Sequence, residues 1–319
     1  RLNPVRYPML LQSVAGGNSL SRWDILFVAN GEGLQSHAGH TSDLTNKPIH
    51  LPFLNALDIE FVAQKKSEQS HLPFIGGWAL YLGYELAAQI EQRLHLPEFT
   101  GPLPDALALR CPAAVLYDKH SDEYIAIAEP NFEFLLDIMF ADIQNCQMSE
   151  PFAVWPDQSM CSEDKPEQFI QAVKRILEYL KSGDVFQVNV SRAWRFTLAN
   201  ANNFAHDIYQ RLCRQNPAPF AGFLQFKNWS LISSSPERLV SVKESRVQTR
   251  PIAGTRPRIQ GENEQDMIDE LIGHPKERAE HVMLIDLERN DLSRVCTPGS
   301  IIVDELMIIE SYEHVHHIV

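Results

Sequence analysis

The pattern of hydrophobic and polar positions predicts many short strands with helices inserted between them. Apolar runs bounded by glycine, proline and polar clusters are typical of strands, and apolar residues three and four positions apart are typical of helices. A helical spacing occurs near 132–144. In the first half of the chain, strand-like runs occupy 7–13, 23–28, 74–84, 113–118 and 123–128.

Two polar segments of the first half are expected to lack regular structure. The sequence Gly16-Gly17-Asn18 predicts a turn between the first two strands. The segment 31–50 is polar and contains glycines, so we expect a loop there. We interpret His37 and His40 in this segment as solvated side chains and not as metal ligands.

Apolar periodicity lapses between Asn145 and Lys165, where polar residues and prolines replace it. The sequence therefore predicts an N-terminal part at 1–144, a linker at 145–165 and a C-terminal part at 166–319.

The C-terminal part is expected to begin with a helix. Pro166 suits a first helical turn, and Gly183 follows the last residue at helical spacing, as is typical of a helix end. An alternating strand is expected at 185–191, with Gln187 on its polar face. Mainly antiparallel strands with helices between them predict the α+β fold class. Further strands are expected at 220–226, 231–235, 239–242, 247–249 and 251–258.

The stretch 275–294 predicts a long helix with two carboxylates at its start. Glu277 and Glu280 are three residues apart and share one helix face, so they could bind one hard divalent cation. The apolar run at 282–287 extends around the helix, which is typical of a helix packed inside a domain. A buried carboxylate pair needs a cation or a counter-charge. The spacing alone equally allows two solvated glutamates beside neighbouring basic residues.

Composition narrows the class of protein. The chain has 319 residues, 28 lysines and arginines and 41 acidic residues, giving a formal net charge of −13, which argues against non-specific nucleic-acid binding. An anionic substrate would therefore need local cations. Five scattered cysteines without a C-x-x-C pair fit a reducing compartment. No apolar run is long enough for a membrane span, and we expect a cytoplasmic protein.

Several common catalytic motifs are absent from the sequence. It contains no G-x-S-x-G, no H-E-x-x-H and no cysteine elbow, so we expect no hydrolytic or glutaminase triad. Adjacent histidines in a strand point to opposite sides, so at most one of His316 and His317 can enter a given site. Glu237 and Thr255 also fit turn or capping roles. The polar residues that together favour a metal-assisted site for an anion are Gln187, Glu237, Thr255, Arg256, Arg258, Glu277, Glu280, His316 and His317.

Ordered motifs between residues 183 and 319 resemble one enzyme family. They are VFQVNVSR, NPAPFAGFLQF, SSSPERLV, RPIAGTRPR, HPKERAEHVMLIDLERNDLSRVC and VHHIV. In this order they resemble the chorismate-utilising enzymes, which include anthranilate, aminodeoxychorismate, isochorismate and salicylate synthases. The looser N-terminal motifs LLQSVAGG, SRWDILF and GGWALYLGYELAAQIE are most similar to the aminodeoxychorismate synthase branch. The resemblance implies antiparallel β-sheets packed as a sandwich with surrounding helices.

The resemblance also implies a role for each matching residue. Glu277 and Glu280 match residues that hold Mg²⁺, a cation that can polarise the departing hydroxyl of chorismate. The matching catalytic residues are His317, Glu237 and Thr255. The matching substrate-binding residues are Gln187, Ala253, Gly254, Met283 and Leu284. The residues that match a tryptophan pocket of some relatives are Gln12, Ser13, Pro219 and Phe220.

Two positions favour an aminating member of the family. Isochorismate and salicylate synthases have a lysine where this chain has Gln187. Some aminodeoxychorismate synthases have a lysine, proposed to attack the ring, where this chain has Ala253, as anthranilate synthases do. The resemblance thus implies direct addition of ammonia to chorismate, with the ammonia coming from a separate glutamine amidotransferase subunit.

Three functions follow from the resemblance. The first is that of aminodeoxychorismate synthase component I, which makes 4-amino-4-deoxychorismate for p-aminobenzoate and folate synthesis. The second is that of anthranilate synthase component I in tryptophan biosynthesis. The third is that of a non-catalytic module that binds tryptophan or docks the amidotransferase. Gln12 replaces the glutamate of the inhibitor-sensitive LLES pattern, so ordinary tryptophan feedback is not expected.

The sequence ends at Val319, inside a family motif. The resemblance implies a glycine-rich segment, a lysine and a second glutamate pair after this point. We therefore expect the C-terminal part to be truncated, with half of the metal site present.

Overall fold

The structure is a computed structural model that describes residues 3–15, 21–64, 70–97, 101–146, 161–197, 204–258 and 263–319. Backbone contacts divide the chain into two compact units. The larger unit comprises Arg1–Met148 together with Ile208–Val319, and the smaller unit comprises Ser149–Asp207. The predicted turn at 16–18 and most of the predicted linker at 145–165 lie outside the described residues.

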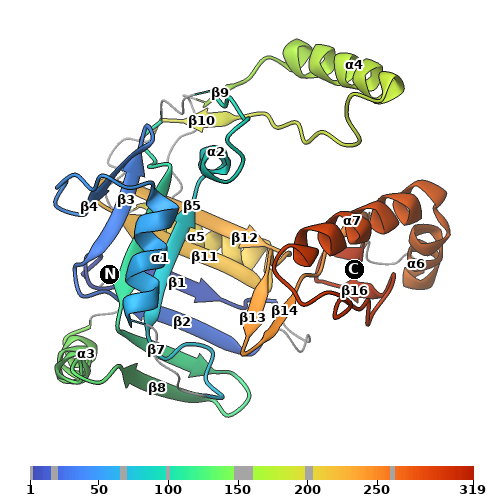
Figure 1. The fold of residues 1–319 in the computed structure, drawn as a ribbon. Coiled ribbons are helices and arrows are strands. Elements are labelled where there is room, and N and C mark those ends of the chain that lie inside the picture. Colours follow the sequence, from blue (N-terminus) through green and yellow to red (C-terminus); the bar gives the residue numbers. More distant parts are fainter. Residues whose placement is uncertain are drawn as a thin grey trace. The chain divides into compact units, whose positions relative to one another are not determined.

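A six-stranded antiparallel sheet is the largest element of the larger unit (Figure 1). Strands β1 and β11 are neighbours although they are far apart in sequence, with Leu11 opposite Gly222. The apolar runs of the sequence correctly predicted all six strands. In sheet order they are β12 (Trp229–Ser235), β11 (Phe220–Phe226), β1 (Met9–Gln12), β2 (Trp23–Val28), β7 (Ala113–Asp118) and β8 (Glu123–Ala128).

A four-stranded antiparallel sheet includes the segment that was expected to be a loop. That expectation was wrong, because residues 33–43 form a hairpin whose turn residues, Ala38 and Gly39, have φ values of 46° and 74°. A turn with two positive φ values matches the twist of paired strands. His37 and His40 face each other at the exposed end of the hairpin, so they are solvated as predicted. The strands, in sheet order, are β4 (His40–Asp43), β3 (Gly33–His37), β6 (Ala106–Cys111) and β5 (Gly77–Leu82).

The two sheets pack face to face, as the family resemblance implied. Their shared core contains Phe27 and Leu224 from the six-stranded sheet and Leu107 and Leu109 from the four-stranded sheet. Because side chains alternate along a strand, Ala106 and Ala108 point to the other face of the four-stranded sheet. There they pack against helix α1 (Phe53–Gln64).

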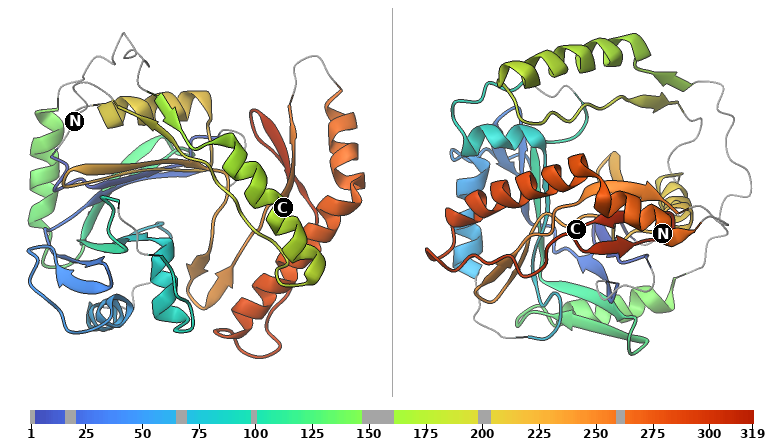
Figure 2. Two further views of the ribbon diagram at one scale, coloured as in Figure 1. Left: turned by 90° about the horizontal axis from the view of Figure 1, so that it is seen from above. Right: turned by 90° about the vertical axis from the view of Figure 1, so that its right-hand side faces the viewer.

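Helix α3 (Phe134–Gln144) covers the outer face of the six-stranded sheet. Leu135 and Met139 pack against Val28 and Ala113. Figure 2 shows this helix, in light green, beside the sheet. The spacing near 132–144 correctly predicted the helix. The remaining short elements of this region are η1 (Tyr84–Leu86) and α2 (Ala87–Ile90).

A buried ion pair fixes the junction between strand β6 and the end of β8. Arg110 is 4% exposed and donates to a Glu129 carboxylate oxygen at 2.5 Å and to the Gly77 carbonyl at 2.9 Å. The neighbouring Gly76 has a φ of 124°, and a Cβ there would lie 2.2 Å from the same carboxylate. Removing one partner of such a pair leaves a buried charge and typically costs about 3–5 kcal/mol.

A small three-stranded sheet and two helices complete the larger unit. The sheet order is β15 (Ala253–Pro257), β17 (Val315–Ile318) and β16 (Ile309–Ser311). Helices α6 (Glu264–Gly273) and α7 (Pro275–Ser293) contact β15. The other elements of this region are α5 (Phe204–Gln215), β13 (Ser241–Lys243) and β14 (Arg246–Gln248).

Helix α7 confirms the predicted helix but not its predicted burial. His274 occupies the N-cap and Pro275 the first turn. The expectation that the apolar run is packed inside the unit was wrong, because Val282 is 53% and Leu287 48% exposed. His281 is the one fully buried residue of this helix. A narrow sheet contacts one face of the helix, and the other apolar residues therefore remain exposed.

The smaller unit contains helix α4 (Pro166–Ser182) and a pair of short strands. As predicted, α4 begins at a proline and ends at Gly183, whose φ is 80°. Strand β9 (Cys161–Glu163) pairs with β10 (Trp194–Phe196). The expected strand at 185–191 was wrong, because this segment is irregular and pairs with none of the described strands. A strand needs a partner for its backbone N–H and C=O groups.

None of the described helices is both long and apolar enough to cross a membrane.

Candidate functional site

The register of the three-stranded sheet aligns three polar side chains on one face. His317 of β17 lies opposite Thr255 of β15 and opposite Glu310 of β16. Directly opposed residues of antiparallel strands point to the same side of a sheet. Thr255, His317 and Glu310 therefore form a row across the sheet, which we call the His317 row. Two of the three predicted catalytic residues, Thr255 and His317, are thus brought together.

His317 is held in a buried environment. Its Nδ1 lies 2.9 Å from the Thr255 hydroxyl, and the side chain is 7% exposed. Burial lowers the pKa of His317, against the opposing effects of a hydrogen bond to the Gly254 backbone and the charges of Glu310 and Glu237. A neutral imidazole can hold a proton on one nitrogen and accept one on the other. The site can therefore deliver or accept a proton at this ring.

His316 points to the opposite face, as strand alternation predicted. It is fully buried, its Nδ1 lies 2.7 Å from the Ser311 hydroxyl, and its Nε2 lies 3.5 Å from Glu264 of α6. Burial also lowers the pKa of His316. This histidine packs between the sheet and α6, away from the His317 row.

Glu237 occupies a turn directly after β12. Its backbone N–H donates to the Ser235 hydroxyl at 3.2 Å, and that hydroxyl donates to the Glu237 carbonyl at 3.0 Å. The carboxylate accepts a hydrogen bond from the Ile252 N–H at 3.0 Å. Glu237 therefore connects this turn to the start of β15, and its charge acts on His317.

Glu277 lies against Gly254 of β15. Gly254 forms a β-bulge with a φ of 83°, and a Cβ at Gly254 would lie 2.9 Å from a Glu277 carboxylate oxygen. Arg256 lies 3.5 Å from Glu277 and 3.0 Å from Glu270. Glu277 and the His317 row thus both lie against β15.

Glu277 and Glu280 provide two half-buried carboxylates one helical turn apart. Among the described residues, no cluster of three or more histidine, cysteine or acidic side chains has the geometry to hold a metal ion. Magnesium usually takes one or two carboxylates from a protein and its other ligands from substrate and water. The two carboxylates of α7 are of the type and number that a protein usually gives to magnesium.

The other predicted substrate-binding residues lie in different surroundings. Ala253 is 2% exposed and begins β15, next to Gly254. Met283 and Leu284 are half-buried on α7. Gln187 belongs to the irregular segment of the smaller unit, between α4 and β10.

The residues that match a tryptophan pocket form part of a hydrogen-bond network around Asp24. The carboxylate of Asp24 accepts from the Ser13 N–H at 3.0 Å, from the Gln12 amide at 2.9 Å and from the Lys119 ammonium at 2.8 Å. Gln12 also accepts from the Tyr209 hydroxyl at 3.0 Å.

Ser13 and Phe220 connect this network to β11. Ser13 donates to the Pro219 carbonyl at 2.9 Å, and Phe220 follows in β11 with Arg238 over its ring. The polar groups at the end of β1 are thus engaged with one another.

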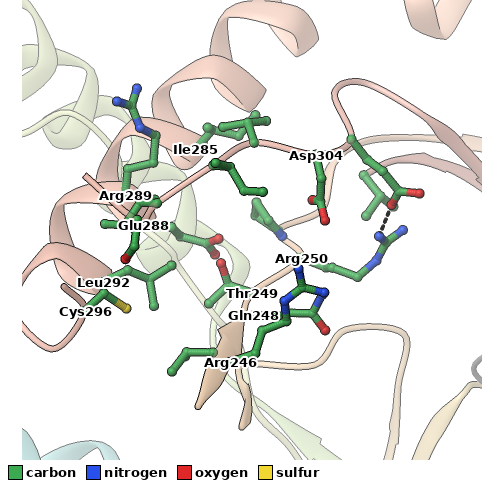
Figure 3. Close-up of a pocket in the computed structure, with 18 of the residues that line it drawn as sticks. Arg246, Gln248, Thr249, Arg250, Ile285, Glu288, Arg289, Leu292, Cys296 and Asp304 are labelled. Carbon is green, nitrogen blue, oxygen red and sulfur yellow. Dashed lines mark hydrogen bonds and ion pairs between the residues drawn. The ribbon is translucent and has the colours of Figure 1, made fainter. Parts of the chain in front are cut away.

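A cavity of about 780 Å³ lies beside the C-terminal half of α7. Figure 3 shows Glu288 next to Thr249 and places Arg246, Arg250 and Arg289 around the space. Burial raises the pKa of Glu288, against a hydrogen bond with Thr249. None of the residues assigned a role from the sequence lines this cavity. It borders the first turns of α7 only through the buried His281.

Sequence reasoning missed Glu310, which belongs to the His317 row, and its two partners Arg250 and Tyr312. Arg250 binds Glu310 at 2.5 Å, and Tyr312 donates to the other oxygen of Glu310 at 2.5 Å. The rings of Tyr312 and His317 are 5.6 Å apart. The one signal that could have found Glu310 and Tyr312 is the short polar turn at 312–314, which predicts a hairpin and thereby places both residues near His317.

Comparison with known proteins assigns the chain to a family. The sequence model of the chorismate binding enzymes matches residues 19–319, so this chain belongs to that family. Its relatives include an aminodeoxychorismate synthase component 1 from Bacillus subtilis, 34% identical over 326 residues, which cover 98% of this chain and 68% of the relative. An anthranilate synthase component 1 from Pseudomonas putida is 33% identical over 338 residues, with 97% and 67% covered.

A third relative and a solved structure agree with this assignment. An anthranilate synthase component I-like protein from Synechocystis is 38% identical over 260 residues, 80% of this chain and 52% of the relative. The chain thus spans between half and about two thirds of these relatives. A crystal structure of anthranilate synthase component I from Streptococcus pneumoniae matches with a TM-score of 0.76 and 26% identity, covering 95% of this chain and 70% of that one. This likeness confirms the α+β sandwich fold.

The close approach of Gly254 to Glu277 predicts a position-specific loss of stability. Gly254 and Gly299 have nearly the same φ, 83° and 81°, but a Cβ would meet Glu277 and Leu271 at Gly254 and nothing within 4 Å at Gly299. We expect Gly299→Ala to lower the free energy of unfolding by about 1 kcal/mol through backbone strain. Gly254→Ala should cost about 2–3 kcal/mol because steric overlap adds to the strain. Urea unfolding measures both; equal losses would contradict the placement of Glu277 against Gly254.

Proposed function

We propose that this chain forms the chorismate site of an aminodeoxychorismate synthase component I. The enzyme would convert chorismate and ammonia into 4-amino-4-deoxychorismate and water, and a separate glutamine amidotransferase would supply the ammonia. The observation that carries this proposal is the buried His317 with its Thr255 partner, within reach of the Glu237 charge, at the strand against which α7 places Glu277. In this proposal the product serves p-aminobenzoate and folate synthesis in the cytoplasm.

The proton chemistry of the reaction can be carried by the His317 row. Amination forms a C–N bond and breaks the C–O bond of the ring hydroxyl, which must leave as water and therefore needs a proton. His317 is the proposed donor, because its ring is held by Thr255 and the charges of Glu310 and Glu237 favour its protonated form. Thr255 orients the ring through Nδ1. Glu237 adds a negative charge that favours the protonated ring.

Glu277 and Glu280 are the residues that would hold a magnesium ion. Bound there, Mg²⁺ would supply Lewis-acid polarisation of the substrate and attraction for its carboxylate. The protein's part is to present the two carboxylates from successive positions of one helix face, with Gly254 leaving space for Glu277.

A substrate with two carboxylates also needs cations from the protein. Arg246, Arg250 and Arg289 line the 780 Å³ cavity, whose volume is within the range of small-molecule sites. Arg250 reaches from this cavity to Glu310 of the His317 row. Arg250 is already paired with Glu305 and Glu310, so Arg246 and Arg289 are the cations that support the proposal of a dianionic substrate.

Two observations favour amination over isomerisation. Gln187 stands where the lysine of isochorismate-forming relatives would activate water. The relatives described above are aminodeoxychorismate and anthranilate synthases. A glutamine side chain has no titratable group to activate water, so ammonia is the more suitable nucleophile.

Anthranilate synthase component I is the second candidate. It is favoured by Ala253, because a chain without a lysine in β15 cannot form a covalent lysine adduct with the ring. Relatives of both names match with similar identity, 34% and 33%.

The residues that match a tryptophan pocket take part in the hydrogen-bond network around Asp24. Gln12 and Ser13 donate to Asp24, and Tyr209 donates to Gln12. An amino acid entering here would have to replace these hydrogen bonds. We therefore infer that tryptophan does not act as a feedback inhibitor of this chain.

Product analysis tests the proposed function. The complete protein is incubated with chorismate, ¹⁵N-labelled ammonia and Mg²⁺, and the products are separated and identified by mass spectrometry. We expect 4-amino-4-deoxychorismate, with its rate unchanged by saturating tryptophan. Anthranilate as the sole product would establish the second candidate. The absence of turnover together with tight tryptophan binding would favour the non-catalytic module.

The metal assignment predicts a selective loss in a variant of α7. We expect Glu280→Gln to abolish Mg²⁺-dependent turnover while the circular dichroism spectrum is unchanged, because the helix loses one of its two carboxylate ligands. Asp286→Asn on the same helix is the matched control, since its side chain is 83% exposed. Turnover and Mg²⁺ titration are measured for both variants. Wild-type magnesium dependence in Glu280→Gln would refute the assignment.

A further inference from the structure

Glu310 is the most firmly held acidic side chain near His317. One of its oxygens accepts from an Arg250 guanidinium nitrogen at 2.5 Å, and the other accepts from the Tyr312 hydroxyl at 2.5 Å. Its side chain is 16% exposed. Two charge-assisted hydrogen bonds fix both oxygens of this carboxylate, which leaves it little rotational freedom.

Arg250 holds a second glutamate that differs from the first in one respect. Glu305 binds the other terminal nitrogen of the same guanidinium, but its side chain is 51% exposed. Glu305 precedes β16, whereas Glu310 lies within it, directly opposite His317. The charge of Glu310 acts on His317, and Glu305 has no corresponding effect. The chain thus offers two glutamates with the same arginine partner, only one of which faces the histidine.

Tyr312 connects the carboxylate to the imidazole. Its ring centroid lies 5.6 Å from that of His317 at an interplanar angle of 60°, while its hydroxyl donates to Glu310. Thr255 restrains the ring from the other neighbouring strand. His317 is therefore bounded by groups from both of its neighbouring strands.

We propose that Glu310 is a positioning residue for His317: clamped by Arg250 and Tyr312, it fixes a negative charge opposite the imidazole and orients the ring for proton transfer. This inference rests on the proposed role of His317 in the amination of chorismate. In this arrangement Arg250 and Tyr312 act through Glu310, and Glu305 shares the arginine without acting on the histidine.

The charges around His317 come from each packed element. Glu310 from β16 and Glu237 from the turn after β12 favour the protonated ring. His316, the neighbour in β17, disfavours it. Arg250 from the segment before β15 is neutralised by its two glutamates. Glu277 of α7 pairs with Arg256 of β15, and Glu264 of α6 faces His316.

The test compares Glu310→Gln with Glu305→Gln in the full chain by NMR titration of the histidine rings. A His317→Asn variant assigns the His317 signal. In Glu310→Gln the negative charge that faces His317 is lost, so the protonated ring is destabilised. We expect the pKa of His317 to fall by about half a unit or more. Glu305→Gln should leave it at the wild-type value.

A second variant keeps the proposal testable if Glu310→Gln fails to fold. Tyr312→Phe retains the ring and removes the hydroxyl that holds Glu310 in place. The carboxylate can then move away from His317, so the pKa of His317 should fall, but by less than in Glu310→Gln. Wild-type values in every folded Glu310 and Tyr312 variant would overturn the proposal, as would an equal fall in Glu305→Gln. The titration uses no substrate, so its failure is distinguishable from a failure of the proposed amination activity.

Discussion

The register of β17 between β15 and β16 is the constraint on which the candidate site depends. Because β17 is the central strand, three of its four residues have a partner on both sides, and a shift of one residue would reverse every side chain. The observed register places Thr255, His317 and Glu310 on one face. It places His316 and Ser311 on the other, where α6 covers them. Backbone hydrogen bonds thereby decide which of two adjacent histidines can take part in chemistry.

Gly254 links this sheet to the acidic helix. A bulge with positive φ interrupts the alternation of β15 and brings its backbone close to both His317 and Glu277. Bulges commonly re-aim side chains next to active sites. A glycine at this point allows the approach of α7, so the proposed metal ligands and the proposed proton donor share one strand as their support. Arg250 lines the 780 Å³ cavity and also binds Glu310, so it connects the cavity to the His317 row.

Local sequence patterns predicted the helices and strands that depend mainly on their own residues. The strands of the six-stranded sheet, the helix at 275–294 and the cap at Gly183 followed from alternation, spacing and capping. The hairpin at 33–43 was missed because its buried strand carries Gln35 and Ser36, polar residues that depend on tertiary partners. The strand expected at 185–191 lacks a neighbouring strand, which periodicity cannot reveal. Family motifs indicated Thr255 and His317, whereas Glu310 and Arg250 became visible only through cross-strand pairing and an ion pair 60 residues apart in sequence.

The central claim is that the two adjacent histidines have separate roles, and a paired substitution tests it most directly. His317→Gln and His316→Gln are each assayed for unfolding free energy and for chorismate-dependent turnover per folded molecule. We predict that His317→Gln lowers kcat about 100-fold per folded molecule, because it removes a general acid. His316→Gln should cost about 1–3 kcal/mol of stability and leave turnover nearly unchanged, because it disturbs a buried hydrogen bond. Full turnover in His317→Gln, or an equal loss of turnover in both variants, would contradict the account.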